Sequence, residues 1–91
     1  MENLTIVMPC YNEETRLART FEIIIPYIAQ HDIELILVDD GSTDNTLKIM
    51  QREALAWAIY KKVKFITYVK NQGKGFAVKK GIEAATKKYI A

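Results

Sequence analysis

The stretch ELILVDDGSTDNT, residues 34–46, decides the fold of this sequence. Glu34–Val38 has an apolar body, which predicts a strand that is covered on both faces. Asp39–Ser42 then forms a turn, and a helix follows it. Three residues compete to cap that helix: Ser42, Thr43 and Asp44. A buried strand that leads through a turn into a helix is the repeating unit of a parallel α/β sheet.

The segments on either side repeat this unit. The run LTIVM, residues 4–8, predicts a β-branched strand closed by Pro9. Asn12 then predicts a helix cap, with Glu13 and Glu14 in the first turn, and Pro26 should loosen the end of that helix. The other elements are expected as a helix from about Asn45 to Tyr60, a strand over Val63–Val69, a turn over Asn71–Gly75, a helix over Phe76–Lys87 and the start of a strand over Tyr89–Ala91.

Helical spacing of apolar residues predicts which side of each helix faces the sheet. For the first helix these residues are Leu17, Phe21, Ile24, Ile25 and Ile28. For the second they are Leu47, Met50, Leu55 (or Ala54), Trp57 and Ala58, and for the third Ala77, Val78, Ile82 and Ala85. The order of strands and helices predicts a mostly parallel sheet with right-handed crossovers and helices on both faces.

Three polar loops follow the predicted strands, at residues 9–14, 39–44 and 70–75. Ligands of open α/β sheets bind beyond the carboxyl ends of the strands, so these loops are the candidate site. A carboxylate of the Asp39–Asp40 pair suits a divalent metal, a phosphoryl group or the hydroxyls of a ribose, or else it serves only the turn. The glycine-bearing turn Gly73–Gly75 before a helix suits a phosphate, although it lacks the spacing of a P-loop and of the dinucleotide fingerprint.

Composition limits the kind of protein. A chain of 91 residues with 49% hydrophobic and 26% charged residues predicts one small folded domain. Its single cysteine, Cys10, excludes a disulfide framework and predicts a small buried residue. Neither a signal peptide nor a membrane span is predicted, so a cytoplasmic location is expected.

Charge is divided unevenly along the chain. Residues 1–45 carry nine acids against two arginines, and residues 46–91 carry eleven basic residues against two acids. This asymmetry predicts a site with a cation or a sugar on one side and phosphates on the other. No aromatic residues interleave the basic stretch in the way that nucleic-acid binding favours, so no nucleic-acid partner is expected.

Taken together, the three loops resemble the amino-terminal half of family 2 glycosyltransferases, with the dolichyl-phosphate mannose or glucose synthase-like members nearest. The matching segments are VMPCYNEE (residues 7–14), LVDDGSTDNT (37–46) and NQGKGFA (71–77), with Gly81 and Ala85. The resemblance implies a three-layer α/β/α, Rossmann-like GT-A fold with strand order 3-2-1-4. It also implies inverting transfer of a sugar from a UDP- or GDP-linked donor.

The resemblance assigns roles residue by residue. Residues matching the nucleotide-sugar-binding positions are Pro9, Tyr11, Glu13, Val38, Asp40 and Lys74, of which Asp40 would contact the nucleoside. Residues matching structural supports of that site are Asp39, Gly41, Gly73 and Gly75. No residue of this chain matches a catalytic or metal-binding position.

The sequence departs from the family after Ala91. Family members continue into a D-x-D motif that holds Mg²⁺ or Mn²⁺, whereas no Asp or Glu follows Glu83 here. Residues 1–91 are therefore expected to be the nucleotide-sugar-binding part of a glycosyltransferase 2 domain, truncated before that motif and inactive alone. The acceptor stays open, with a lipid phosphate as one option, and so does the alternative of a non-catalytic nucleotide-binding remnant or assembly module. The cut edge of the sheet is expected to promote self-association.

Overall fold

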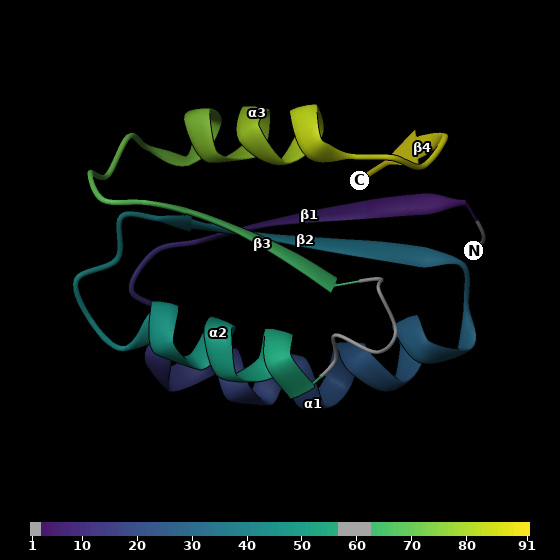
Figure 1. The fold of residues 1–91 in the computed structure, drawn as a ribbon, viewed down its shortest axis with the longest axis horizontal. Coiled ribbons are helices and arrows are strands. Elements are labelled where there is room, and N and C mark those ends of the chain that lie inside the picture. Colours follow the sequence, from purple (N-terminus) through teal and green to yellow (C-terminus); the bar gives the residue numbers. More distant parts are fainter. Residues whose placement is uncertain (1–2, 57–62) are drawn as a thin grey trace.

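A computed structural model describes residues 3–56 and 63–91 (Figure 1). Strands and helices alternate along the chain. They are β1 (Leu4–Cys10), α1 (Glu14–Gln30), β2 (Ile33–Asp40), α2 (Thr46–Ala56), β3 (Val63–Tyr68), α3 (Lys74–Ala84) and β4 (Tyr89–Ile90). No helix in this part of the chain is both long enough and apolar enough to cross a membrane.

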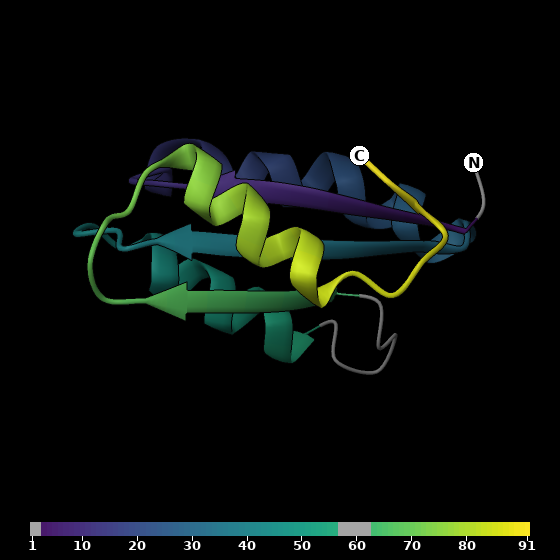
Figure 2. The same cartoon turned by 90° about the horizontal axis from the view of Figure 1, so that it is seen from above.

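The four strands form one parallel sheet in the order β3-β2-β1-β4, which confirms the predicted topology. Helices α1 and α2 cover one face and α3 covers the other, so the domain has three layers (Figures 1 and 2). β1 is in register with β2 over its whole length, whereas β4 is paired only with Leu4 and Thr5. The carboxyl ends of β1, β2 and β3 therefore meet at one edge of the sheet.

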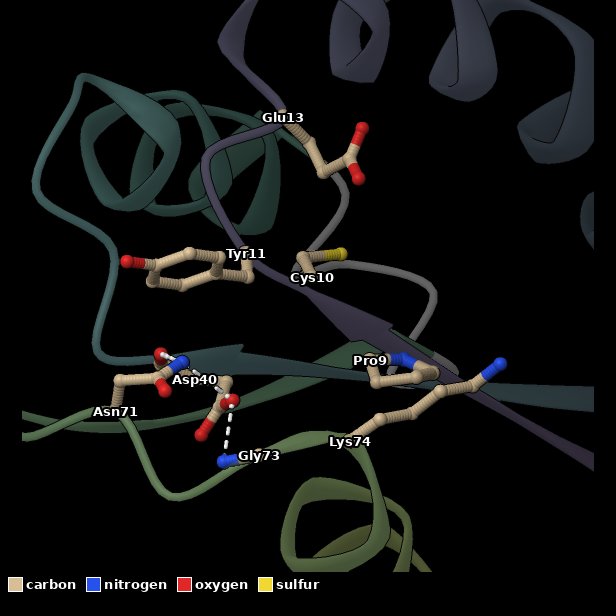
Figure 3. A pocket seen from close by; sticks show the side chains of 8 residues that line it. All are labelled: Pro9, Cys10, Tyr11, Glu13, Asp40, Asn71, Gly73 and Lys74. Carbon is tan, nitrogen blue, oxygen red and sulfur yellow. Dashed lines mark hydrogen bonds between the residues drawn. The ribbon is translucent and has the colours of Figure 1, made fainter.

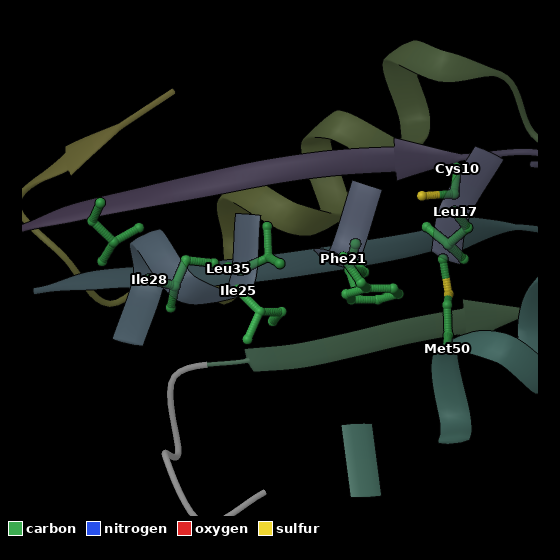
Figure 4. Packing of buried hydrophobic residues seen from close by; sticks show 9 residues of the cluster. Cys10, Leu17, Phe21, Ile25, Ile28, Leu35 and Met50 are labelled. Atoms are coloured by element: carbon green, nitrogen blue, oxygen red, sulfur yellow. The ribbon is translucent and has the colours of Figure 1, made fainter. Parts of the chain in front are cut away.

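β2 is the centre of the core, because all eight of its residues are buried. On one face, Leu35 and Leu37 pack against the apolar stripe of α1 and against Met50 of α2 (Figure 4). On the other face, Ile36 and Val38 pack against α3. The predicted stripe of α1 is confirmed, since Leu17, Phe21, Ile25 and Ile28 are buried and Ile24 packs against them.

The beginning of α1 differs from the prediction. Asn12 does not cap the helix, which begins at Glu14. Instead Asn12 has a left-handed backbone (φ 51°), and its Oδ1 accepts a hydrogen bond from the Thr43 N–H at 2.9 Å. Asparagine tolerates this conformation better than most residues, so it suits a turn as well as a cap. Pro26 does not end the helix, which continues to Gln30.

Asp44, one of the three predicted caps of α2, bonds the first residue of the helix: its Oδ1 accepts the Thr46 N–H at 2.9 Å. Met50 is buried as predicted, and Ile49 also packs against the core. The predicted end of this helix at Tyr60 lies outside the described residues. So do the predicted inward positions Trp57 and Ala58 and the side chains of Ala54 and Leu55.

α3 begins two residues earlier and ends three residues earlier than predicted, and its inner side is partly different. Ala77 is buried, but Ile82 is 46% exposed, so its predicted inward position is wrong. The helix faces the sheet with Ala77 and Gly81, which lie one turn apart. A Cβ at Gly81 would collide with the side chain of Val7, so the small residue sets how closely α3 approaches β1.

A buried carboxylate ties four segments together at the amino-terminal edge of the sheet. Glu34 is 4% exposed and accepts hydrogen bonds from Thr5 of β1 and from the N–H and hydroxyl of Thr86, at 2.9–3.0 Å. Lys64 of β3 forms an ion pair with it at 2.7 Å. Burial would raise the pKa of Glu34, but these partners outweigh it and lower the pKa from 4.5 to about 2.

Candidate functional site

A cavity of about 580 Å³ opens at the carboxyl edge of the sheet, where the three predicted loops meet (Figure 3). Its lining residues are Pro9, Cys10, Tyr11, Glu13, Asp40, Asn71, Gly73 and Lys74. Tyr11 lies on one side of the cavity, and Asp40, Asn71, Gly73 and Lys74 lie on the other (Figure 3). A cavity of this size is within the range that small-molecule sites occupy.

The first two loops are joined by hydrogen bonds that fix the position of Tyr11. The N–H of Asn12 donates to the Ser42 hydroxyl at 3.0 Å, and the N–H of Glu13 donates to the buried Thr46 hydroxyl at 2.8 Å. The Thr43 N–H returns a bond to Asn12. Tyr11 therefore stands on a braced turn, with 45% of its surface exposed.

Asp40 joins the second loop to the third. Its Oδ1 accepts the Tyr68 hydroxyl at 2.6 Å and the Gln72 N–H at 2.9 Å. Its Oδ2 accepts the Asn71 amide at 2.8 Å and the Gly73 N–H at 3.0 Å. Burial would raise the pKa of Asp40, but the hydrogen bonds from Tyr68, Gln72 and Gly73 outweigh it and lower that pKa.

Asp39 faces the opposite side of the sheet, as the alternation along a strand requires. It does not line the cavity, and its carboxylate accepts the Ser42 N–H at 3.2 Å and the Thr67 hydroxyl at 3.0 Å. These bonds hold the turn after β2 and connect it to β3. A role for Asp39 as a structural support of the site remains a prediction.

At two of the predicted glycine positions, Gly41 and Gly73, the backbone conformation favours glycine. Gly41 has φ +64°, and a Cβ there would collide with the backbone of Lys70 and Asn71, so glycine lets the second and third loops touch. Gly73 has φ +97° and precedes α3. Gly75 has open space around its Cβ position, so no close contact requires glycine there.

The remaining predicted residues differ in their relation to the cavity. Pro9 lines it, and Glu13 lines it while pairing with Arg16 at 2.5 Å. Lys74 is exposed at the start of α3, and its ammonium points away from Asp40 (Figure 3). Val38 is fully buried and does not line the cavity.

Sequence reasoning missed two partners in the site, Tyr68 and Asn71. Asn71 lies in one of the matching segments but has no predicted role, yet its amide donates to the Asp40 carboxylate. Tyr68 sits opposite Asp40 in the β2–β3 register, a pairing that strand alternation alone does not reveal. Across residues 3–56 and 63–91, no group of three or more His, Cys, Asp or Glu side chains is placed to hold a metal ion.

A parallel sheet with crossover helices and a cavity at its carboxyl edge defines an open α/β ligand-binding fold. Comparison with known sequences identifies the family: the sequence model of the family "Glycosyl transferase family 2" matches residues 5–91. The chain belongs to glycosyl transferase family 2.

Individual relatives agree with this family. The chain is 39% identical over 88 residues to the mouse (Mus musculus) dolichyl-phosphate beta-glucosyltransferase, a match covering 89% of this chain and 27% of that protein. It therefore spans about a quarter of the length of this curated relative.

Solved structures share the fold. The mannosyltransferase PcManGT from Pyrobaculum calidifontis, in complex with GDP-Man and Mn²⁺, superposes with a TM-score of 0.69 at 26% identity, over 92% of this chain and 24% of that chain. The S. aureus TarS 1–349 structure in complex with UDP has a TM-score of 0.72 at 22% identity, over 99% of this chain and 26% of that one. The predicted GT-A arrangement is thereby confirmed.

Proposed function

We propose that residues 1–91 form the nucleotide-sugar-binding part of an inverting glycosyltransferase. The observation that carries this proposal is the cavity at the carboxyl edge, which places an exposed tyrosine opposite a lysine at a helix amino terminus. Such a cavity suits a ligand with an aromatic base at one end and phosphates at the other. Membership of glycosyl transferase family 2 supports the same ligand class.

The base and ribose would lie on the side of Tyr11. Its ring is exposed on a braced turn, so it can stack on a nucleobase with little loss of conformational freedom. Pro9 would contribute apolar contact, and the Glu13 carboxylate is placed to accept from ribose hydroxyls. By resemblance, Asp40 and the backbone of Val38 would also lie beside the nucleoside. Of these two, Asp40 lines the cavity, across from Tyr11, whereas Val38 is buried.

The diphosphate would lie on the side of α3. Lys74 supplies positive charge at the cavity, and no side chain caps the first turn of the helix. Unsatisfied N–H groups and the helix dipole favour an anion at this end. Gly73, with its left-handed backbone, leaves room for close approach of a phosphate.

The chain's own residues supply binding and orientation rather than the transfer step. A Mg²⁺ or Mn²⁺ ion, if the longer enzyme uses one as the PcManGT complex with Mn²⁺ suggests, would need ligands beyond the described residues. A lipid phosphate is the acceptor that the name of the mouse relative favours. Such an acceptor is already ionised and needs no general base. Residues 1–91 contribute positioning of the donor.

Titration of the protein with UDP and with GDP, followed by amide resonances, tests the binding proposal. We expect shifts in residues 9–13, 38–42 and 71–75. Tyr11→Ala should weaken binding about tenfold or more, as loss of one stacking contact implies. Tyr27→Ala is a matched control, because Tyr27 is exposed to the same extent (47% against 45%) and lies on α1 away from the cavity. Shifts confined to scattered lysines would contradict the proposal.

An activity assay tests whether residues 1–91 alone are sufficient for sugar transfer. With Mn²⁺ and a nucleotide sugar, the 91-residue chain is expected to transfer no sugar above a heat-inactivated control. Metal-dependent transfer above that control would overturn this expectation. A chain that binds neither nucleotide would favour the alternative of an assembly module.

A further inference from the structure

Tyr68 is a polar residue next to the cavity for which the nucleotide proposal gives no role. It ends β3 directly opposite Asp40 in the parallel register, and its hydroxyl donates to Asp40 Oδ1 at 2.6 Å. Its ring contacts Phe76 of α3 edge to face, with centroids 5.2 Å apart. Tyr68 does not line the cavity itself, so its hydroxyl would act on a ligand through its partner Asp40.

The carboxylate of Asp40 is fully occupied by donors. A carboxylate offers about four lone-pair positions, and Asp40 accepts four hydrogen bonds, two on each oxygen. Three of the donors belong to the loop of residues 71–73. Tyr68 is the fourth, and it comes from a strand of the sheet rather than from the loop.

This division gives the two kinds of donor different effects. The loop donors attach residues 71–73 to Asp40, whereas the Tyr68 hydroxyl attaches Asp40 to the rigid sheet. The ring of Tyr68 is in turn braced by Phe76. Lys74 follows Gly73 directly, so the position of the loop sets the position of Lys74 and of the first turn of α3.

We propose that Tyr68 is a positioning residue of the nucleotide pocket, acting through Asp40 to fix the loop of residues 71–73 and with it Lys74. This inference rests on the proposed function for its ligand, but the placement of the loop can be measured without any ligand. Hydrogen bonds to charged groups are among the stronger ones in proteins, so loss of this hydroxyl should be measurable.

Tyr68→Phe tests the proposal, because phenylalanine keeps the ring and its contact with Phe76. Tyr89→Phe is the control, since Tyr89 lies in β4 and is 54% exposed. We expect Tyr68→Phe to weaken binding of UDP or GDP by up to about tenfold, because only the molecules with the loop in its binding position take up the nucleotide. We expect the control to bind like the wild type.

Two further readouts distinguish positioning from a general loss of stability. In the free protein, the amide resonances of Gln72 and Gly73 should shift in Tyr68→Phe and stay unchanged in Tyr89→Phe. In a double-mutant cycle, Tyr68→Phe should cost little further affinity once Asp40 is changed to Ala, because the hydroxyl then has no acceptor at this position. Binding is measured well below the thermal midpoint of each variant, so that unfolding does not contribute to the loss of affinity.

Different results would contradict the inference about Tyr68 and the proposed function. Wild-type affinity in Tyr68→Phe overturns the inference, and tighter binding overturns it by showing that the hydroxyl competes with the nucleotide for Asp40. If the wild-type chain binds no nucleotide, the proposed function fails. The inference is then decided in the free protein, where unchanged Gln72 and Gly73 resonances in Tyr68→Phe would overturn it.

Discussion

Asp39 and Asp40 are adjacent in the sequence but serve different neighbours. Alternation along β2 sends Asp39 toward Thr67 on one face and Asp40 toward Tyr68 on the other. The sequence predicts this divergence, and it predicts that the residues after each strand form the site. It does not predict that Thr67 and Tyr68 of β3 donate to these two carboxylates, because that pairing depends on the register between strands 28 residues apart.

The thiol of Cys10 is predicted to be unreactive in the folded protein. Cys10 is 3% exposed, and burial, together with the charges of Glu13 and Asp39, raises its pKa from 9.0 to about 12. Because the thiolate is the reactive form, labelling by a disulfide reagent at pH 8 should be at least about a hundredfold slower than in urea. Equal rates in the native and unfolded protein would contradict this prediction.

Glu34 is predicted to make the free energy of unfolding depend on pH in the acid range. Its pKa is about 2 in the folded protein and 4.5 ordinarily, so its contribution is fully present above about pH 4.5 and is lost as the pH falls toward 2. Glu34→Gln should lower the free energy of unfolding by about 2 kcal/mol at pH 7, with a smaller difference at pH 3. Urea unfolding at both pH values measures this.

The control for Glu34 is Glu22→Gln, at an exposed position of α1. It should leave the free energy of unfolding within about 0.5 kcal/mol of the wild type. A Glu34→Gln protein with the same pH dependence as the wild type would show that Glu34 is not the group responsible.

At the scale of elements, α3 shows where apolar periodicity fails. The pattern favours large residues such as Ile82 for the inner side, whereas the helix uses its smallest ones, Ala77 and Gly81, to approach the sheet. A glycine carries no hydropathy signal, so its role is visible only once Val7 is placed beneath it. The strongly apolar α1 and β2 were predicted well because burial there depends on large side chains.

Gly81→Ala is predicted to destabilise the protein, although alanine is the better helix former. The added methyl would meet both branches of Val7, a side chain with little rotamer freedom. We expect the free energy of unfolding to fall by about 1–3 kcal/mol. Gly75→Ala, where the space is open, should be neutral or stabilising in the same urea titration.

A rescue experiment checks the cause. In a Val7→Ala background, Gly81→Ala should cost less than it does in the wild type, because the opposing methyl groups are gone. An undiminished cost in that background would mean that the collision with Val7 is not the reason.

At the scale of the described chain, the edge of β1 is only partly paired. β4 covers only the start of β1, and among the described strands none is paired with the outer side of Met8–Cys10. Beside this edge lies a groove of about 400 Å³ lined by Ile6, Thr20, Ile23, Ile24 and Tyr27. Ile23 is 67% exposed there. An open strand edge next to an apolar groove favours pairing with another chain.

We therefore propose that this chain self-associates, most simply as a symmetric dimer that covers the β1 edge and the groove. Sedimentation equilibrium over a wide concentration range should show the dimer, and Ile23→Lys should shift it toward monomer. Ile82→Lys is the control, since Ile82 is exposed on α3 at the other face of the sheet. A wild-type monomer at high micromolar concentration would sink the proposal.

The hydrogen bonds around Glu34 also constrain the order in which the chain can fold. Thr86 meets Glu34 across 52 residues, and the Lys87 N–H meets Thr5 across 82 residues, so neither bond can form before α3 has been synthesised. The β1–β2 pair, linked only through α1, can form much earlier. During synthesis on the ribosome, β1 and β2 would pair while α3 and β4 are still unmade. Until then Glu34 would lack the two donors of Thr86, so its hydrogen bonds would be completed only after α3 has packed on the sheet.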